Sequence, residues 1–282
     1  MNTQHNNPDN SDIVISKLSH AKAHANDLII PDDIPGGDMP GDKINISDDL
    51  IKKARILFPH IADEICISIP NNPYGRTVIS VCGGSGVGKS VISSILSYMF
   101  NSFGIGCYTM SGDNYPHRIP KNNDAERLRL YKEGGKHALD AYLGSPAEID
   151  FDKVNSILKA FKNGADILTL KRMGRDEDSI RYEDVDMSST QILILEWTHG
   201  NSDYLNYIDI PILLNSTPEE TLEYRRFRNR DKSVDSPFTT LVLKLEQDKL
   251  YSQAHKAKII LTKSGNIIDY PTYRTLMEDH NE

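Results

Sequence analysis

Residues 83–90, with the sequence GGSGVGKS, constrain this chain more than any other feature. They follow a short apolar run at residues 77–82 (TVISVC), which is typical of a strand buried on both faces of a parallel sheet. They precede residues 89–101, where apolar side chains recur at the spacing of one helix face. A glycine-rich turn between a strand and a helix directs successive backbone N–H groups toward one point, beside the positive end of the helix dipole. The segment therefore predicts a phosphate-binding loop.

This loop fits the pattern G-x-x-x-x-G-K-[ST] in full. In that pattern Lys89 reaches the β- and γ-phosphates of a nucleotide, and the hydroxyl of Ser90 holds Mg²⁺. A chance glycine-rich turn is the alternative, but average composition produces the pattern in only about 1% of chains this long. The expected nucleotide-binding residues are Gly83, Gly84, Ser85, Gly86, Val87, Gly88, Lys89 and Ser90.

Strand and helix patterns alternate beyond the loop. Short apolar runs predict further strands at residues 106–110, 191–195, 210–214 and 258–261. A helix is expected at residues 151–161, and another from Thr217, where Thr, Pro and Glu stand in the order of a helix start. Strands separated by helices predict an α/β fold of the P-loop NTPase type, a mostly parallel sheet with helices on both faces.

Charge and composition exclude several classes of partner. The 282 residues include 32 Lys and Arg against 40 Asp and Glu, a net charge of −8, which argues against a nucleic-acid or anionic-membrane surface. No run approaches the roughly 18 apolar residues of a membrane span. Cys66, Cys82 and Cys107 form no CxxC pair, which fits a reducing compartment. We expect a cytoplasmic protein with a small-molecule partner and no nucleic acid or membrane, and homo-oligomerisation stays open.

The segment SGDNYPHR follows the strand expected at residues 106–110. In a parallel sheet it would lie at the carboxyl end of that strand, beside the phosphate loop, where ligands bind. There Asp113 would accept the proton of a substrate hydroxyl as it attacks the γ-phosphate. Tyr115 would wall the acceptor pocket, and His117 and Arg118 would hold a polar or anionic group of the acceptor. An ordinary Gly-Asp-Asn turn is the alternative.

Glu196 ends the strand expected at residues 191–195. An acid at the tip of a buried strand, next to the phosphate loop, suits a role with Mg²⁺ or in orienting the attacking group. The alternative is a solvated strand end.

The helix expected from Thr217 carries four arginines, Arg225, Arg226, Arg228 and Arg230. Such a charge run is usually a solvated helix face. If this helix closes over the site as a lid, its arginines would neutralise the charge that develops on the transferred phosphoryl group.

Together these motifs resemble the uridine kinase–phosphoribulokinase family of P-loop small-molecule kinases. The similarity runs from about residue 76 to 265 and keeps the order of the family's motifs. The phosphate loop comes first, followed by an Asp-x-aromatic motif at Asp113 and a counterpart of H-P-x-A-F-D-F at residues 145–152. A strand that ends in Glu196 and the R-R…R-D motif of the lid come after them. The resemblance implies ATP as donor, Mg²⁺ held by Ser90 and Glu196, and Asp113 as general base. It implies Arg226 and Arg230 as the lid arginines that contact the nucleotide.

One departure concerns the acceptor. Uridine kinases read the nucleoside with a Y-D-x-x-x-H-x-R segment, whereas residues 170–175 here (LKRMGR) contain neither Tyr nor His. Arg172 and Arg175 would instead meet an anionic or sugar-like acceptor, and a surface hairpin is the equal alternative.

The N-terminal quarter has no counterpart in that family. Residues 1–45, rich in Asn, Asp, Pro and Gly, are expected to form a flexible leader with a short helix near residues 13–28. Residues 46–75 predict a helical appendage that is capped by Ser47 and ends near Pro59. The kinase domain would then span residues 76–282.

The combined hypothesis is an ATP-dependent phosphotransferase that phosphorylates a hydroxyl of a sugar, polyol or sugar acid, with Asp113, Lys89 and Glu196 as catalytic residues. The rivals are a nucleoside kinase and a catalytically inactive nucleotide-binding regulator. The base-reading N-K-x-D of GTPases is absent from the sequence. ATP rather than GTP as donor rests on the resemblance.

Overall fold

A mostly parallel β-sheet forms the centre of the computed structural model, which describes residues 10–228 and 236–279. Within these residues the sheet has six strands in the order β2-β5-β1-β6-β7-β8, and only β8 is antiparallel to its neighbour. The strands are β1 (Thr77–Gly83), β2 (Cys107–Ser111), β5 (Ile192–Glu196), β6 (Ile210–Leu214), β7 (Ile259–Leu261) and β8 (Ile267–Ile268). The predicted α/β fold is confirmed.

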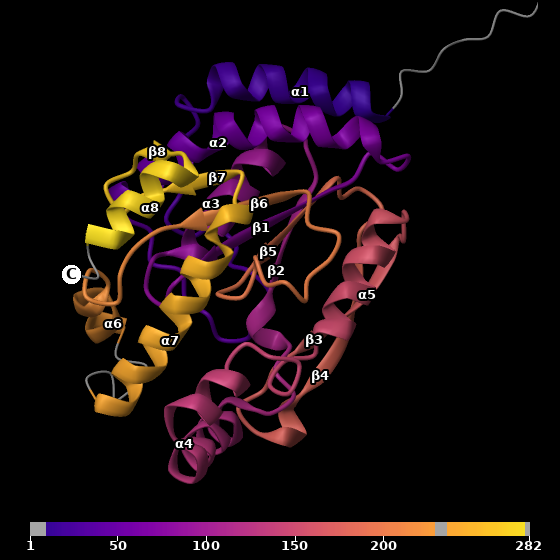
Figure 1. Ribbon diagram of the computed structural model, residues 1–282. Helices are drawn as coiled ribbons and strands as arrows, with labels where there is room; N and C mark the ends of the chain where they lie inside the picture. The colour runs from indigo at the N-terminus through magenta and orange to yellow at the C-terminus, as the bar shows by residue number, and fades with distance from the viewer. Residues whose placement is uncertain (1–9, 229–235, 280–282) are drawn as a thin grey trace, which may run out of the picture.

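Helices cover both faces of this sheet (Figure 1). The helices of the described residues are α1 (Asn10–His24), α2 (Asp48–Ser68), α3 (Lys89–Ser102), α4 (Pro120–Tyr142), α5 (Phe151–Lys162), α6 (Leu222–Arg228), α7 (Pro237–Gln253) and α8 (Tyr270–Asp279). Alternation along β1 explains the layers, because successive side chains of a strand point to opposite faces. Ile79 and Val81 pack with α2 and α3, Val78 packs with α5, and Cys82 packs with α7 and α8.

A separate two-stranded hairpin lies near the carboxyl end of β2. Strands β3 (Ile167–Arg172) and β4 (Arg181–Asp186) pair antiparallel, with Arg172 opposite Arg181. Leu168 and Leu170 on one face of β3 are buried against the same core as α5. The hairpin occupies the stretch in which uridine kinases carry their nucleoside-reading segment.

The N-terminal region packs more tightly than its composition predicts. Val14, Leu18, Ala21 and Ala25 recur on one face of α1 or just after it, and all four are buried against the α2 layer. The expected loose attachment of residues 1–45 therefore does not describe residues 10–45, because this apolar face gains from burial. The domain boundaries at 45 and 75 stay predictions.

Helix α2 is capped as predicted but ends later than predicted. The side chain of Ser47 accepts a hydrogen bond of 3.4 Å from the backbone N–H of Leu50. The helix continues through Pro59 to Ser68, because Ile61 and Ile65 beyond the proline are completely buried. Burying these side chains offsets the cost of an internal proline, about 3 kcal/mol.

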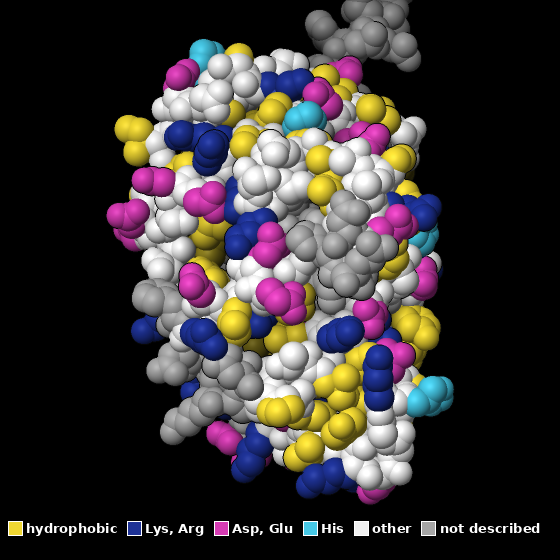
Figure 2. Space-filling view, turned by 60° about the vertical axis from the view of Figure 1, so that its left-hand side comes forward, with side chains coloured by type: hydrophobic (Ala, Val, Ile, Leu, Met, Phe, Trp, Pro, Cys, Tyr) yellow, Lys and Arg dark blue, Asp and Glu magenta, His cyan; other side chains and the backbone are white. Residues whose placement is uncertain are grey.

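Surface charges of both signs are mixed. Figure 2 shows Lys and Arg side chains interspersed with Asp and Glu side chains over one face of the molecule. Among the helices of residues 10–228 and 236–279, none is long and apolar enough to cross a membrane.

Candidate active site

A cavity of about 420 Å³ lies where the carboxyl ends of the central strands meet the phosphate loop. Lys89 and Ser90, at the start of α3, line one side of it, and Asp113 and Glu196, which follow β2 and end β5, line another. The sheet brings these residues together because its parallel strands end at the same edge. The four residues expected to carry the chemistry therefore share one cavity.

The loop requires its glycines for two reasons. Gly86 and Gly88 have φ angles of +85° and +98°, a region that side-chain-bearing residues rarely adopt. A Cβ atom on Gly86 would also lie 2.9 Å from Cγ of Arg225. The Nζ of Lys89 donates a hydrogen bond of 3.1 Å to the carbonyl of Gly84, which keeps the ammonium group over the loop. A phosphate group fits this cradle of backbone N–H groups.

Glu196 is held between two serine hydroxyls. Ser111 Oγ donates to Oε1 over 2.8 Å, and Ser90 Oγ donates to Oε2 over 3.3 Å. Burial, and then the nearby charge of Asp113, raise the pKa of Glu196 to about 7, although Lys89 opposes the shift. A hydroxyl and two neighbouring carboxylates offer the hard oxygen ligands that Mg²⁺ prefers, and a cation would relieve their repulsion. The site therefore fits Mg²⁺, with Ser90 and Glu196 as the residues that would hold it.

The turn that carries Asp113 is fixed against β5. This turn, the 3-10 helix η2 (Gly112–Asn114), follows β2 directly. A Cβ atom on Gly112 would lie 2.1 Å from the ring of Trp197, so the backbone packs directly on the indole. The packing joins the ends of β2 and β5 and sets the spacing between Asp113 and Glu196.

Four predicted acceptor residues are not brought to the cavity. Tyr115 is fully buried in the core beneath the site, where its hydroxyl faces Met110 Sδ at 3.9 Å. His117 bonds to the Pro146 carbonyl at 3.1 Å, and Arg118 donates to the hydroxyl of Tyr142 over 3.1 Å. Arg175 is exposed beyond the end of β3. None of the four lines the cavity, and their roles toward an acceptor stay predictions.

Arg172 is already paired within the protein. Its guanidinium donates to Asp38 over 2.7 Å, to Glu183 over 2.8 Å and to the hydroxyl of Tyr108 over 3.0 Å. These three bonds direct the charge away from the cavity. Residues 170–172 form the end of β3, Arg172 does not line the cavity, and its role toward an acceptor stays a prediction.

Helix α6 presents Arg225, one of the four arginines expected in the lid, to the cavity. Arg225 lines the cavity, whereas Arg226 is exposed to solvent. The predicted Arg230 lies outside the described residues. Thr217 and Glu220 bond reciprocally, as a helix start predicts, but α6 begins only at Leu222.

Sequence reasoning missed several cavity residues from distant parts of the chain. Arg127 on α4 and Glu246 on α7 lie 3.9 Å apart in the wall, and Arg127 also pairs with the buried Glu148 at 2.7 Å. Met39 and Asp42 enter the wall from the N-terminal region. No local motif in the sequence marks these residues, because each reaches the wall through contacts with distant parts of the chain.

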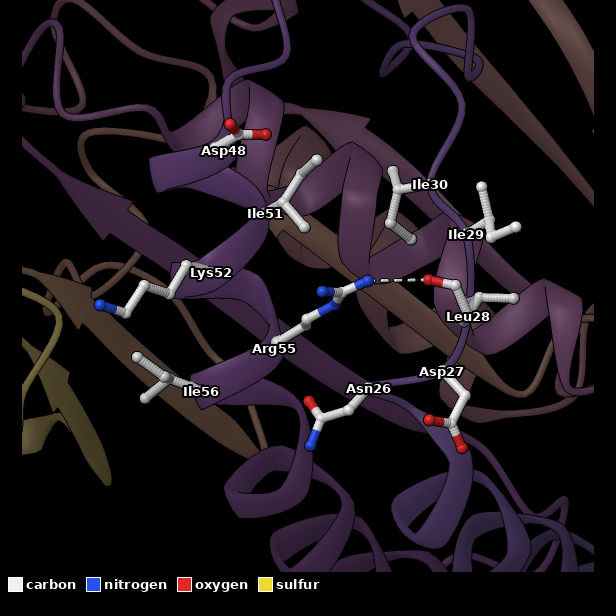
Figure 3. Close-up of a pocket in the computed structure, with 10 residues that line it drawn as sticks. All are labelled: Asn26, Asp27, Leu28, Ile29, Ile30, Asp48, Ile51, Lys52, Arg55 and Ile56. Atoms are coloured by element: carbon white, nitrogen blue, oxygen red, sulfur yellow. Dashed lines mark hydrogen bonds between the residues drawn. The ribbon is translucent and has the colours of Figure 1, made fainter.

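A second hollow of about 780 Å³ lies between residues 26–30 and the first turns of α2 (Figure 3). Isoleucines make up much of its lining, and Arg55 donates a hydrogen bond of 2.9 Å across it to the carbonyl of Leu28. It shares no lining residue with the cavity at the phosphate loop. This hollow therefore takes no part in the candidate site.

Comparison with known proteins assigns the family. The model of the phosphoribulokinase/uridine kinase family matches residues 78–234, more than half of the chain. The chain belongs to this family. It is a P-loop small-molecule kinase, and the family implies ATP as its phosphoryl donor.

One relative and one solved structure are similar to this chain. The bifunctional alpha-galactosidase/sucrose kinase AgaSK of Mediterraneibacter gnavus is 48% identical over 198 residues, covering 70% of this chain and 21% of that protein. The chain thus spans about a fifth of the length of that relative. The structure of phosphoribulokinase from Rhodobacter spheroides superimposes with a TM-score of 0.52 at 16% identity, over 66% of this chain and 70% of the other. That likeness confirms the shared fold.

Proposed function

We propose that this chain is an ATP-dependent sugar kinase, with sucrose as the first acceptor to test. The observation that supports the acceptor class is the 48% identity to a protein with a sucrose kinase activity in its name. The polar cavity beside the phosphate loop supports the reaction class, since it combines a phosphate cradle with a carboxylate placed to accept a proton.

The proposed reaction is an in-line phosphoryl transfer. Asp113 accepts the proton of the acceptor hydroxyl, whose oxygen forms a bond to the γ-phosphorus of ATP. The bond between that phosphorus and the bridging oxygen breaks at the same time, which leaves a sugar phosphate and ADP. Lys89 and Arg225 neutralise charge on the transferring group. Mg²⁺, if held by Ser90 and Glu196, would supply further neutralisation of the phosphate charge.

The lining of the cavity favours a sugar over a nucleoside. Arg127, Thr198, Thr239 and Glu246 offer hydrogen-bond donors and acceptors that match sugar hydroxyl groups. Among the described residues, no aromatic ring lines the cavity, so a planar base would have no stacking partner there.

Measuring ADP release with a panel of acceptors tests the proposal. Sucrose is expected to raise the rate above background more than fructose, glucose, glycerate or uridine. Asp113→Asn should lower kcat by about 10²–10⁴-fold, because it removes the proton acceptor. The exposed Asp178→Asn is the matched control and should leave kcat unchanged. A preference for uridine would favour a nucleoside kinase, and ATP binding without release in the presence of any acceptor would favour a regulator.

A further inference from the structure

Residues 36–42, called here the N-terminal strap, lie against the end of β2. The side chain of Asp38 in this strap is only 5% exposed. Its Oδ1 accepts hydrogen bonds from the backbone N–H of Ser111, over 2.7 Å, and from Nδ2 of Asn114, over 3.0 Å. Ser111 and Asn114 stand on either side of the turn that carries Asp113. One carboxylate oxygen from the strap thus holds both sides of that turn.

The other oxygen of Asp38 ties the strap to the β3–β4 hairpin. Oδ2 accepts a hydrogen bond of 2.7 Å from Arg172 and one of 3.3 Å from the hydroxyl of Tyr108. Arg172 in turn donates to Glu183 of β4. Asp38 is therefore the point at which the strap, the end of β2 and the hairpin meet.

Asn114 extends the same network. Its side chain is fully buried, and while Nδ2 donates to Asp38, its Oδ1 accepts a hydrogen bond of 2.8 Å from the backbone N–H of Met173. Both ends of the amide are thus occupied, so it cannot rotate without losing a bond. The residue that follows Asp113 is fixed by the strap on one side and by the hairpin on the other.

We propose that Asp38 is a positioning residue for Asp113, which it holds through Ser111 and Asn114 at the distance that phosphoryl transfer requires. This inference rests on the proposed role of Asp113 as proton acceptor. It assigns to the N-terminal strap a part in the kinase site, and to Arg172 the task of orienting Asp38.

The charge of Asp38 and the position of the N-terminal strap at the cavity support the assignment. Burial raises the pKa of Asp38 to about 6 although the Ser111 N–H and Arg172 favour its ionised form, so the carboxylate is charged at neutral pH. A misplacement of about 1 Å at a reacting group costs on the order of 10²-fold in rate. The same strap also brings Met39 and Asp42 to the cavity wall. Its position is therefore coupled directly to the geometry of the site.

The first test compares Asp38→Asn with Asp33→Asn, an exposed aspartate just before the strap. We expect Asp38→Asn to lower kcat by about 10–100-fold. The dissociation constant of ATP, measured by calorimetry, should change less than about twofold, because the loop of residues 83–90 is not touched. Asp33→Asn should match the wild type in both. Wild-type kcat in a folded Asp38→Asn protein would overturn the proposal.

A double-mutant cycle separates positioning from a merely structural role. If Asp38 acts through Asp113, adding Asp38→Asn to the Asp113→Asn variant should lower kcat no further. The proposal would be overturned if Asp38→Asn lowered kcat by the same factor in the wild type and in the Asp113→Asn variant. Should Asp113→Asn itself retain wild-type kcat, the proposed role of Asp113 as proton acceptor fails instead, whereas an inactive Asp113→Asn beside a fully active Asp38→Asn rejects only the positioning role.

Tyr108→Phe covers the case in which Asp38→Asn does not fold. It removes only the hydroxyl that bonds both Asp38 and Arg172. A fall of about threefold or more in kcat, with ATP affinity kept, is the expected result. An unchanged kcat would count against the network.

Discussion

The Oγ of Ser111 donates a hydrogen bond of 2.8 Å to Oε1 of Glu196 and so joins the carboxyl ends of β2 and β5. Asp113 follows Ser111 by two residues, which makes this bond the link between the two acids of the site. Each acid lies in a cavity that also contains Lys89 and Ser90. Burial, and after it the repulsion from Asp113, raise the pKa of Glu196 to about 7. The arrangement costs stability in the ligand-free protein, and a bound cation would relieve that cost.

Glu196→Gln should therefore stabilise the ligand-free protein and impair the enzyme. The pKa of Glu196 is raised to about 7 in the folded protein, so the ionised carboxylate lowers the stability of the protein as pH rises from 4.5 through 7. The gain in melting temperature on substitution should therefore be clearest at pH 8. Turnover should fall, and the Mg²⁺ concentration for half-maximal rate should rise about tenfold or more, because one oxygen ligand is lost. Calorimetry and Mg²⁺ titration of the rate measure the two effects.

The exposed Glu219→Gln is the control for this substitution and should change neither quantity. An unchanged Mg²⁺ requirement in Glu196→Gln would contradict the metal role of Glu196. An unchanged melting temperature at pH 8 would contradict the electrostatic cost.

Substitution of Arg225 should lower kcat far more than substitution of Arg226. Arg225 lines the cavity and packs its Cγ toward Gly86, whereas Arg226 is exposed. Arg225→Gln is expected to lower kcat by about 10²-fold, because a cation beside the transferring phosphoryl stabilises its developing charge. Arg226→Gln should change kcat less than about threefold. Steady-state kinetics at saturating ATP decide between them, and a larger effect at Arg226 would support the lid role that the resemblance implies for Arg226.

The fold was largely predictable because its strongest signals are local. The strands β5 and β6 lie within one residue of the predicted runs, since strands buried on both faces are continuously apolar. The packing of α1 and the passage of α2 through Pro59 were missed. Both depend on apolar contacts with segments far along the chain, which outweigh local composition and helix propensity.

The site was predictable where chain topology alone places residues. Asp113 and Glu196 follow parallel strands, and the sheet brings them to the loop whatever the details of packing. Arg172 was not predictable in this way, because its direction depends on Asp38, which is 134 residues away in the chain. Arg127 likewise reaches the cavity through its pairing with Glu148 rather than through any local motif.

Arg127→Met should destabilise the protein far more than Arg129→Met on the same helix. Arg127 is 19% exposed and pairs with Glu148, which is 1% exposed, so its loss leaves a buried carboxylate without its cation. Breaking such a pair costs about 3–5 kcal/mol. Arg129 is 50% exposed and pairs at the surface with Glu126, where solvent screens the pair and its loss should have little effect on stability. Urea unfolding at pH 7 compares the two, and equal losses would refute the buried pairing.

His199 should make the protein less stable in mild acid. Its ring lies against Gly144, where a Cβ atom would come within 2.7 Å, and it meets Trp197 edge-on at 5.5 Å between centroids. Burial lowers the pKa of His199 to about 4, against the opposing charge of Glu148. As pH falls below 6.5, the unfolded chain takes up a proton that the folded protein does not bind, so stability is lost as pH falls.

The shifted pKa of His199 alone should lower the free energy of unfolding by about 2 kcal/mol between pH 7 and pH 5. The His199→Gln variant lacks this titrating group. Its free energy of unfolding should therefore fall less between pH 7 and pH 5 than that of the wild type, by about 2 kcal/mol. His137→Gln, an exposed histidine on α4, should retain the full wild-type loss. Urea unfolding of the three proteins at both pH values measures the differences. A loss in His199→Gln as large as that of the wild type would show that His199 titrates normally in the folded state.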